Sequence, residues 1–222
     1  MHLNLITQNI NNFFRNLRYT LYIKFLFFKK KKIFDLKNLA LEDNKLTKLM
    51  NNYFSDKGNL NNVHSYTQFY HSIFDSITQN KLNVFEVGIG SIDENVTFHM
   101  KHSHQNYLPL ASLKAWRDYF PNSEIYGADI DKKIITSINR IKTYHVDMTK
   151  KESIINMWKN IDVKMDIIID DGFHSYEANT EFFKYSYEML NNNGYYIVED
   201  VHRKPFNIKK FFSVVNCCAY KI

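Results

Sequence analysis

Short apolar runs alternate with longer amphipathic segments between residues 82 and 200, and this alternation limits the folds that the chain can adopt. The apolar runs lie at Leu82–Val87, Glu124–Asp129, Ile141–Val146, Met165–Asp170 and Gly194–Glu199. They are too short and too uniformly apolar for surface helices, so we predict strands that are buried on both faces. The segments between them predict helices at Leu110–Phe120, Lys132–Ile138, Lys151–Asn160 and Tyr176–Asn191. The pattern indicates an α/β fold with a mostly parallel central sheet and helices on both faces.

Helical spacing also precedes the first predicted strand. Leu39–Phe54 has the pattern of a helix, and Ser55–Tyr70 passes from a polar loop into a second helix. Near the other end, the sequence Asn191-Asn192-Asn193-Gly194 predicts a helix stop before the last strand.

The last two apolar runs both end in a pair of acidic residues. Asp170 and Asp171 close one run, and Glu199 and Asp200 close the next. Neighbouring parallel strands lie about 5 Å apart and present their carboxyl ends at the same edge of a sheet. Four carboxylates gathered there would repel one another unless a cation balanced them. With His174 in the following turn, the pattern favours a divalent metal site over the alternative of two solvated strand ends or helix caps.

The first predicted strand runs into a turn with two glycines, Gly88 and Gly90, in the motif FEVGIG. Glycine allows a tight turn at which the backbone approaches a ligand. Asp93 stands where a dinucleotide fingerprint has its next glycine, which disfavours a nicotinamide enzyme. Asp129 ends the second predicted strand and is placed to accept hydrogen bonds from ribose hydroxyls. Asp147, after the third, is placed for an adenine amino group, so the two acids favour a nucleoside-bearing cofactor over ordinary strand-end residues.

We expect residues 1–40 to form a basic amphipathic extension and residues 41–222 to form one larger domain. The aromatic-rich segment Phe13–Phe28 is followed by four lysines, Lys29–Lys32. Charged residues interrupt a run that is already shorter than the roughly 20 residues of a spanning helix, so no transmembrane helix is expected. No small-residue cleavage pattern follows it, which argues against a signal peptide. Residues 13–32 fit either a helix that contacts a membrane surface or, as we favour, a helix packed on its own domain or on another subunit.

The formal net charge of +6 suggests anionic partners, but the tetralysine run carries much of it. The rest of the chain is nearly balanced, so we do not expect a nucleic-acid partner. Cys217 and Cys218 are adjacent, which argues against a disulfide between them and fits a reducing cytosol.

Residues 91–109 break the alternation as a long polar segment that contains His99, His102 and His104. Structureless loops of this length are often functional, so we expect a lid over substrate or cofactor. A zinc site is disfavoured because no cysteine lies nearby.

Several segments together resemble known enzymes. FEVGIG, GADID and VDMT are similar to the cofactor-binding motifs of class I S-adenosylmethionine-dependent methyltransferases. SDKG followed by HSYTQFY, ASLKAWRDYFPN, IIDDGFHS and YYIVEDV resembles the metal-dependent sugar O-methyltransferases, the group that includes the mycinamicin and macrocin enzymes. The resemblance covers roughly residues 45–203 and implies the Rossmann-like class I methyltransferase fold. The first 40 residues have no counterpart in it, and little sequence follows the last motif, so we expect the C-terminal edge of the sheet to be short or truncated.

The resemblance also implies roles for individual residues. The metal ligands of the group, which binds magnesium, correspond to Asp171, Glu199 and Asp200, and its general base corresponds to His174. The residues expected to hold S-adenosylmethionine are Glu86, Gly88, Gly90, Asp129 and Asp147, with Lys57 and Tyr66 closing over its methionine end. Asp170 is expected either to face the amine of the cofactor or to support the metal ligands.

The implied activity is methyl transfer from S-adenosylmethionine to a sugar hydroxyl, with Mg²⁺ or Mn²⁺ as the cation. A nucleotide-linked sugar for surface or capsular polysaccharide is one expected acceptor. We expect a homo-oligomer in the cytoplasm, with peripheral contact to the inner face of the membrane as the alternative for residues 13–32. Two alternatives remain: a catechol-type small-molecule O-methyltransferase, and a non-catalytic membrane-associated scaffold with a degenerate methyltransferase fold. An RNA methyltransferase is disfavoured because no basic, aromatic-interleaved face surrounds the predicted site.

Overall fold

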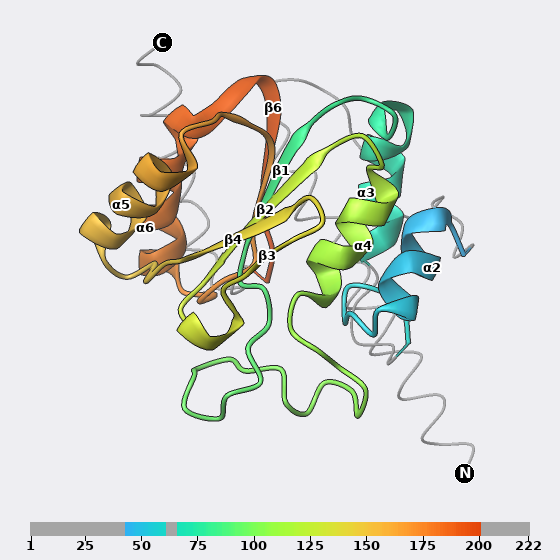
Figure 1. The fold of residues 1–222 in the computed structure, drawn as a ribbon, viewed down its shortest axis with the longest axis horizontal. Helices are drawn as coiled ribbons and strands as arrows, with labels where there is room; N and C mark the ends of the chain where they lie inside the picture. The colour runs from blue at the N-terminus through green and yellow to red at the C-terminus, as the bar shows by residue number, and fades with distance from the viewer. Residues whose placement is uncertain (1–42, 61–65, 201–222) are drawn as a thin grey trace. The chain divides into compact units, whose positions relative to one another are not determined.

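The computed structural model describes residues 43–60 and 66–200, which lie in one compact unit that contains a six-stranded sheet. Figure 1 shows the sheet between two groups of helices. The strands are β1 (Asn83–Val87), β2 (Glu124–Asp129), β3 (Ser137–Ile138), β4 (Ile141–His145), β5 (Met165–Asp170) and β6 (Leu190–Val198). The α-helices are α2 (Lys45–Asn52), α3 (Tyr66–Phe74), α4 (Ala111–Tyr119), α5 (Lys151–Ile161) and α6 (Tyr176–Ser186). Short 3₁₀ helices follow at Asp75–Ile77 (η1), Lys132–Ile134 (η2) and Tyr187–Met189 (η3).

The strand order is β3-β4-β2-β1-β5-β6. Strands that follow β1 in the sequence are thus added first on one side of it and then on the other, so the strand order reverses at β1. β1 pairs in parallel with both β2 and β5, while β4 and β6 extend the parallel sheet on either side. The short edge strand β3 is antiparallel to β4. The predicted α/β, Rossmann-like fold with a mostly parallel sheet is therefore confirmed. In such sheets ligands collect outside the carboxyl ends of the strands, beside the point where the order reverses.

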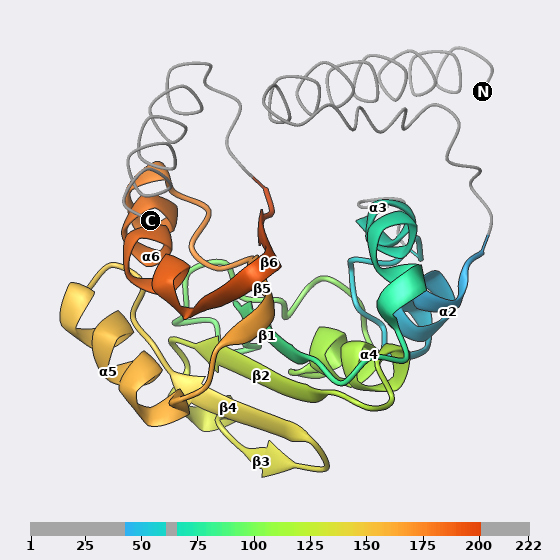
Figure 2. The ribbon, with the colours of Figure 1, turned by 90° about the horizontal axis from the view of Figure 1, so that it is seen from above.

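Helices cover both faces of the sheet, as Figure 2 shows from above. One apolar cluster joins α2, α3 and α4 to the sheet residues Val84, Ile125, Ile141, Ile167 and Ile169. The other joins α5 and α6 to Phe85, Val87, Tyr126, Met165 and Ile168. Successive strand residues thus point to opposite faces, and both faces are buried, which is why the runs are apolar throughout rather than alternating.

The predicted helix stop before the last strand is wrong. The Asn191–Gly194 segment is not a helix stop, because β6 begins at Leu190 and the asparagines lie within it. The side chain of Asn191 donates to Asp166 Oδ1 at 2.8 Å, and the pairing of β5 with β6 is irregular between Met165 and Ile167. Local turn chemistry at Asn and Gly is here overridden by pairing with the neighbouring strand.

The helix predicted at Lys132–Ile138 is also wrong. Only Lys132–Ile134 forms a short 3₁₀ turn, and Ser137–Ile138 forms β3. Thr136 and Thr143 bind each other across this hairpin, since the N–H of Thr136 donates to Thr143 Oγ1 at 2.6 Å and Thr143 Oγ1 donates to Thr136 O at 2.9 Å. The exposed edge of the sheet is thus formed by a hairpin of β3 and β4, where the sequence pattern had indicated a helix.

The predicted lid at residues 91–109 contains no helix or strand, and it links β1 to α4 (Figure 1). The extension at 1–40, the segment 13–32 and the C-terminal edge after residue 200 lie outside the described residues. No helix within the described ranges is both long enough and apolar enough to span a membrane.

Arg140, the residue before β4, connects the start of that strand to the end of α4 through hydrogen bonds. Its guanidinium donates to the backbone carbonyls of Arg117, Phe120 and Ser123 at 3.0, 3.1 and 2.6 Å. The carbonyl of Phe120 also accepts the N–H of Ser123 at 3.2 Å, so Arg140 is its second donor, while Arg140 supplies a side-chain donor to the carbonyls of Arg117 and Ser123.

We predict that Arg140→Met lowers the free energy of unfolding by about 1–3 kcal/mol, because it removes the guanidinium donor from the carbonyls of Arg117 and Ser123. Urea unfolding followed by circular dichroism measures the change. The matched control is Lys142→Met, two residues later on β4, whose ion pair with Glu124 is solvent-exposed and should matter by less than about 0.5 kcal/mol. Equal losses in the two variants would contradict the role given to Arg140.

Candidate active site

The two acidic pairs lie side by side because β5 and β6 are parallel and in register. Asp170 pairs with Val198, and the N–H of Glu199 donates to Asp170 O at 2.9 Å. The residues that follow the two strands, Asp171 after β5 and Glu199 and Asp200 after β6, therefore leave the sheet at the same edge. The predicted adjacency of these two strand ends is confirmed.

Asp171, His174 and Asp200 offer ligand atoms that all lie within 4.8 Å of one another, a geometry that could hold a metal ion. His174 Nε2 is 3.9 Å from Asp171 Oδ1. His174 and Asp200 both have positive φ, at 52° and 47°. Residues with side chains rarely adopt this backbone region, and such strain is concentrated at functional sites. The turn after each strand thus aims a side chain toward one common point.

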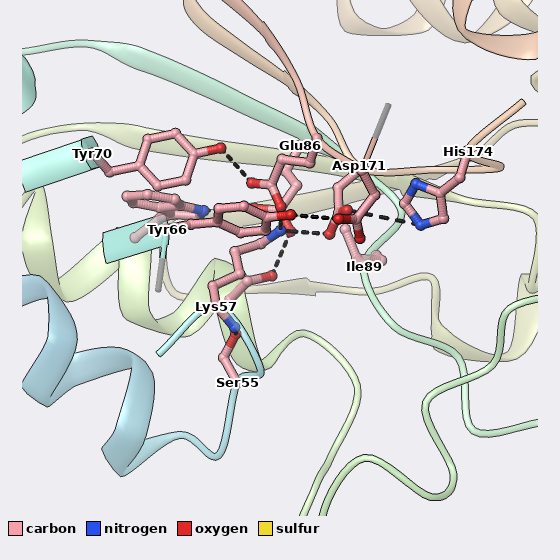
Figure 3. Close-up of polar contacts among 12 residues, drawn as sticks. Ser55, Lys57, Tyr66, Tyr70, Glu86, Ile89, Asp171 and His174 are labelled. Atoms are coloured by element: carbon pink, nitrogen blue, oxygen red, sulfur yellow. Dashed lines mark hydrogen bonds and ion pairs between the residues drawn. The ribbon is translucent and has the colours of Figure 1, made fainter. Parts of the chain in front are cut away.

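Lys57 lies behind this group and contacts the carboxylates directly (Figure 3). Its Nζ is 2.5 Å from Asp171 Oδ2, 2.7 Å from Glu199 Oε2 and 3.7 Å from Glu86 Oε1. The lysine is only 2% exposed. Burial alone would lower the pKa of Lys57, but the neighbouring carboxylates outweigh it and raise the pKa well above its ordinary value. Lys57 is therefore a buried cation with three anionic neighbours.

Two tyrosines of α3 complete the contacts to the acidic pair after β6. The hydroxyl of Tyr66 donates to Asp200 Oδ1, and that of Tyr70 donates to Glu199 Oε1. Both oxygens of Glu199 thus accept from protein donors, one from Tyr70 and one from Lys57. A carboxylate oxygen has two lone pairs, so these bonds leave Glu199 capable of binding a cation.

Glu86 belongs to the same buried polar cluster. Its carboxylate accepts from Ser112 Oγ at 2.6 Å and from Trp116 Nε1 at 2.5 Å, both on α4. Burial raises the pKa of Glu86, and the charge of Lys57 acts against that rise. The structure thus places Glu86 among protein donors inside the fold, and its contact with a cofactor stays a prediction.

The glycine turn after β1 depends on backbone freedom and on close approach. Gly88 has φ +85°, and a Cβ there would lie 2.0 Å from Asp171 O. Gly90 has φ +82°, and a Cβ there would lie 1.6 Å from the hydroxyl of Tyr107. Tyr107 of the predicted lid therefore lies against the turn at Gly90. The turn at Gly88 packs against the backbone of Asp171, which follows β5.

The two predicted nucleoside-binding acids lie at the same sheet edge with defined partners. Asp129 accepts the N–H groups of Ile89 and Asp131, each at 2.9 Å, and burial raises its pKa. Asp147 accepts from Thr149 Oγ1 at 2.6 Å and pairs with Lys150 at 2.9 Å. Burial acts to raise the pKa of Asp147, but these contacts outweigh it and lower the pKa, so the carboxylate is ionised at neutral pH.

Asp170 is separated from the other predicted site residues. It is 0% exposed and follows Ile168 on the face of β5 that α5 and α6 cover, whereas Lys57 and Glu86 lie on the α4 side. Burial raises the pKa of Asp170 to about 7. Its proposed contact with a cofactor amine stays a prediction, and the structure does not bring Asp170 into the Lys57 cluster.

Sequence reasoning missed Tyr70, Trp116 and Tyr107 as site residues. Tyr70 lies four residues after Tyr66 in HSYTQFY, so both project from the same side of α3, and that spacing was a usable signal. Trp116 and Tyr107 meet the site through tertiary packing, which no local spacing reveals.

No protein-family model matches this sequence. Among characterised proteins, the chain is 30% identical over 142 residues to the 8-demethyl-8-alpha-L-rhamnosyl tetracenomycin-C 2'-O-methyltransferase of Streptomyces olivaceus, covering 63% of this chain and 34% of that protein. It is 28% identical over 156 residues to the mycinamicin VI 2''-O-methyltransferase of Micromonospora griseorubida, covering 70% of this chain and 36% of that protein.

Among solved structures, the chain is similar to the MycE methyltransferase of mycinamycin biosynthesis, in a complex with Mg, SAH and mycinamycin VI. The TM-score is 0.59 and the identity 27%, over 71% of this chain and 39% of that one. The expected resemblance to sugar O-methyltransferases and the expected methyltransferase fold are confirmed. The chain spans about a third of the length of the curated relatives that it matches.

We predict that Gly88→Ala disrupts the site, because its Cβ would displace the backbone at Asp171 and the φ is unfavourable for alanine. The midpoint temperature of thermal unfolding should fall by several degrees. The affinity for Mn²⁺, measured by electron paramagnetic resonance, should also decrease. The matched control is Gly172→Ala, whose Cβ would meet the flexible end of Met148 rather than backbone. Normal Mn²⁺ binding by Gly88→Ala would show that the turn tolerates displacement.

Proposed function

We propose that this protein transfers a methyl group from S-adenosylmethionine to a sugar hydroxyl, assisted by a divalent cation. The observation that carries the proposal is the convergence of Asp171, His174 and Asp200 at the carboxyl edge of a methyltransferase fold. The similarity to enzymes that methylate sugar hydroxyls supports it.

The donor set suits magnesium or manganese. Asp171, Glu199 and Asp200 supply carboxylate oxygens, which these hard cations prefer over nitrogen or sulfur ligands. We assign those three residues as ligands and keep His174 as the base. The cofactor would be held at the glycine turn of Gly88 and Gly90, with Asp129 and Asp147 facing its nucleoside.

The difficult partner in this reaction is the sugar hydroxyl, which is a very weak acid. A divalent cation held by the carboxylates would supply positive charge that stabilises the developing alkoxide. His174 accepts the hydroxyl proton as general base while the oxygen attacks the methyl carbon. The carbon–sulfur bond breaks with its electron pair left on sulfur, so the products are a methyl ether, S-adenosylhomocysteine and protonated His174.

The acceptor that we propose is a sugar attached to a larger group. The basic charge of the chain, +6, supports a nucleotide-linked sugar for capsular polysaccharide as one such acceptor. A sugar on an apolar group is favoured by two aromatic rings beside the proposed base. Phe98 and Phe173 are 54% and 39% exposed, and the Phe98 ring centroid lies 5.5 Å from those of both Phe173 and His174.

The test of function is methyl transfer from radiolabelled S-adenosylmethionine to a panel of acceptors. We expect turnover of one or more rhamnosides, offered as free sugar, nucleoside-diphosphate sugar and aryl glycoside, and little turnover of catechol. Chelation with EDTA should abolish transfer, and added Mg²⁺ or Mn²⁺ should restore it. An enzyme indifferent to exhaustive chelation contradicts the metal, and preference for catechol contradicts the sugar. No saturable binding of S-adenosylmethionine would favour a scaffold.

We predict that His174→Ala lowers kcat by about 10²–10⁴-fold, because the base that accepts the hydroxyl proton is gone. Calorimetric binding of S-adenosylhomocysteine should be unchanged. Mn²⁺ binding separates the two roles open to His174, general base and metal ligand. Removal of a base leaves Mn²⁺ binding intact, whereas removal of a ligand weakens it. Near-normal turnover would remove His174 from the mechanism.

A further inference from the structure

One segment of the chain supplies a donor to each of the three proposed metal ligands. Lys57 donates to Asp171 and Glu199, and, from the same N-terminal part of the chain, Tyr70 donates to Glu199 and Tyr66 to Asp200. The acceptors follow β5 and β6, more than a hundred residues later in the sequence. Figure 3 shows Lys57 and the two tyrosines on one side of Asp171, with His174 on the other.

The two oxygens of Asp171 face different partners, whereas both oxygens of Glu199 accept from protein donors, one from Lys57 and one from Tyr70. Asp171 accepts Lys57 through Oδ2, while its Oδ1 faces His174. Asp200 accepts Tyr66 through Oδ1. Hydrogen bonds of this kind, made behind a metal ligand, fix its orientation and its separation from the other ligands.

Charge supports the same reading. Asp171 and Glu199 place two carboxylates against one buried lysine, with Glu86 Oε1 at 3.7 Å, so the ammonium of Lys57 offsets part of the negative charge gathered at this edge. A buried lysine is costly unless it is well paired, and Lys57 is paired with both Asp171 and Glu199 at 2% exposure. The position of Lys57 is therefore determined by Asp171 and Glu199, and their positions depend in turn on Lys57.

We propose that Lys57 is a positioning residue of the metal site, which holds Asp171 and Glu199 at the spacing of a divalent cation with the help of Tyr70. The inference rests on the proposed function, because it takes these carboxylates as ligands. It differs from the expectation that Lys57 closes over the methionine end of the cofactor. The proposal rests on the contacts of the Lys57 ammonium with these two carboxylates, at 2.5 and 2.7 Å.

The experiment measures two binding constants on the full chain, for Mn²⁺ by electron paramagnetic resonance and for S-adenosylhomocysteine by calorimetry. We expect Lys57→Met to weaken Mn²⁺ binding by about tenfold or more and to leave S-adenosylhomocysteine binding within about twofold. Tyr70→Phe removes one hydroxyl without a change of charge, and should weaken Mn²⁺ binding by about threefold. Lys184→Met, which removes an exposed lysine of α6, is the matched control and should change neither.

The outcomes separate the roles. Mn²⁺ binding that is unchanged or stronger in Lys57→Met overturns the proposal, and so does loss of S-adenosylhomocysteine binding alone, which would make Lys57 a cofactor ligand. If circular dichroism shows that Lys57→Met does not fold, Tyr70→Phe decides, and normal Mn²⁺ binding there counts against the proposal. Failure of the unaltered protein to bind Mn²⁺ contradicts the proposed function itself, and Lys57 is then an ordinary buried ion pair.

Discussion

The parallel pairing of β5 with β6 is the constraint on which the site depends. Because Asp170 is in register with Val198, the residues that follow both strands emerge at one edge of the sheet. A shift of one residue in this register would send Glu199 to the opposite face and separate it from Lys57. The irregularity near Met165 and Ile167 lies at the far end of the pair, so the end that bears the site stays regular.

Around this edge, buried charged groups of the protein balance one another. Glu86, Asp171 and Glu199 share one lysine, and α4 contributes Ser112 and Trp116 to Glu86. Each of these groups would be costly alone in the interior. The cluster is tolerated because its members satisfy one another, which also means that few of them can change independently.

The fold and the acids at the ends of β5 and β6 were predictable from sequence because both leave local signals. Apolar runs buried on both faces indicate parallel strands, and acids at their ends, such as Asp171 and Glu199, mark the functional edge. The start of β6 was not predictable, since its asparagines gain partners such as Asp166 only through strand pairing. The bond between Lys57 and Glu199 left no local signal either, because 142 positions separate the two residues.

That separation has a consequence for how the chain acquires its site during synthesis. Lys57 is made early, but Glu199 joins it only after almost all of the described chain exists. Closing so long a loop is slow and costs conformational entropy. A fragment that ends before β6 would keep an apolar sheet and a lysine without one of its partners, so this arrangement favours burial of Lys57 only in the finished domain.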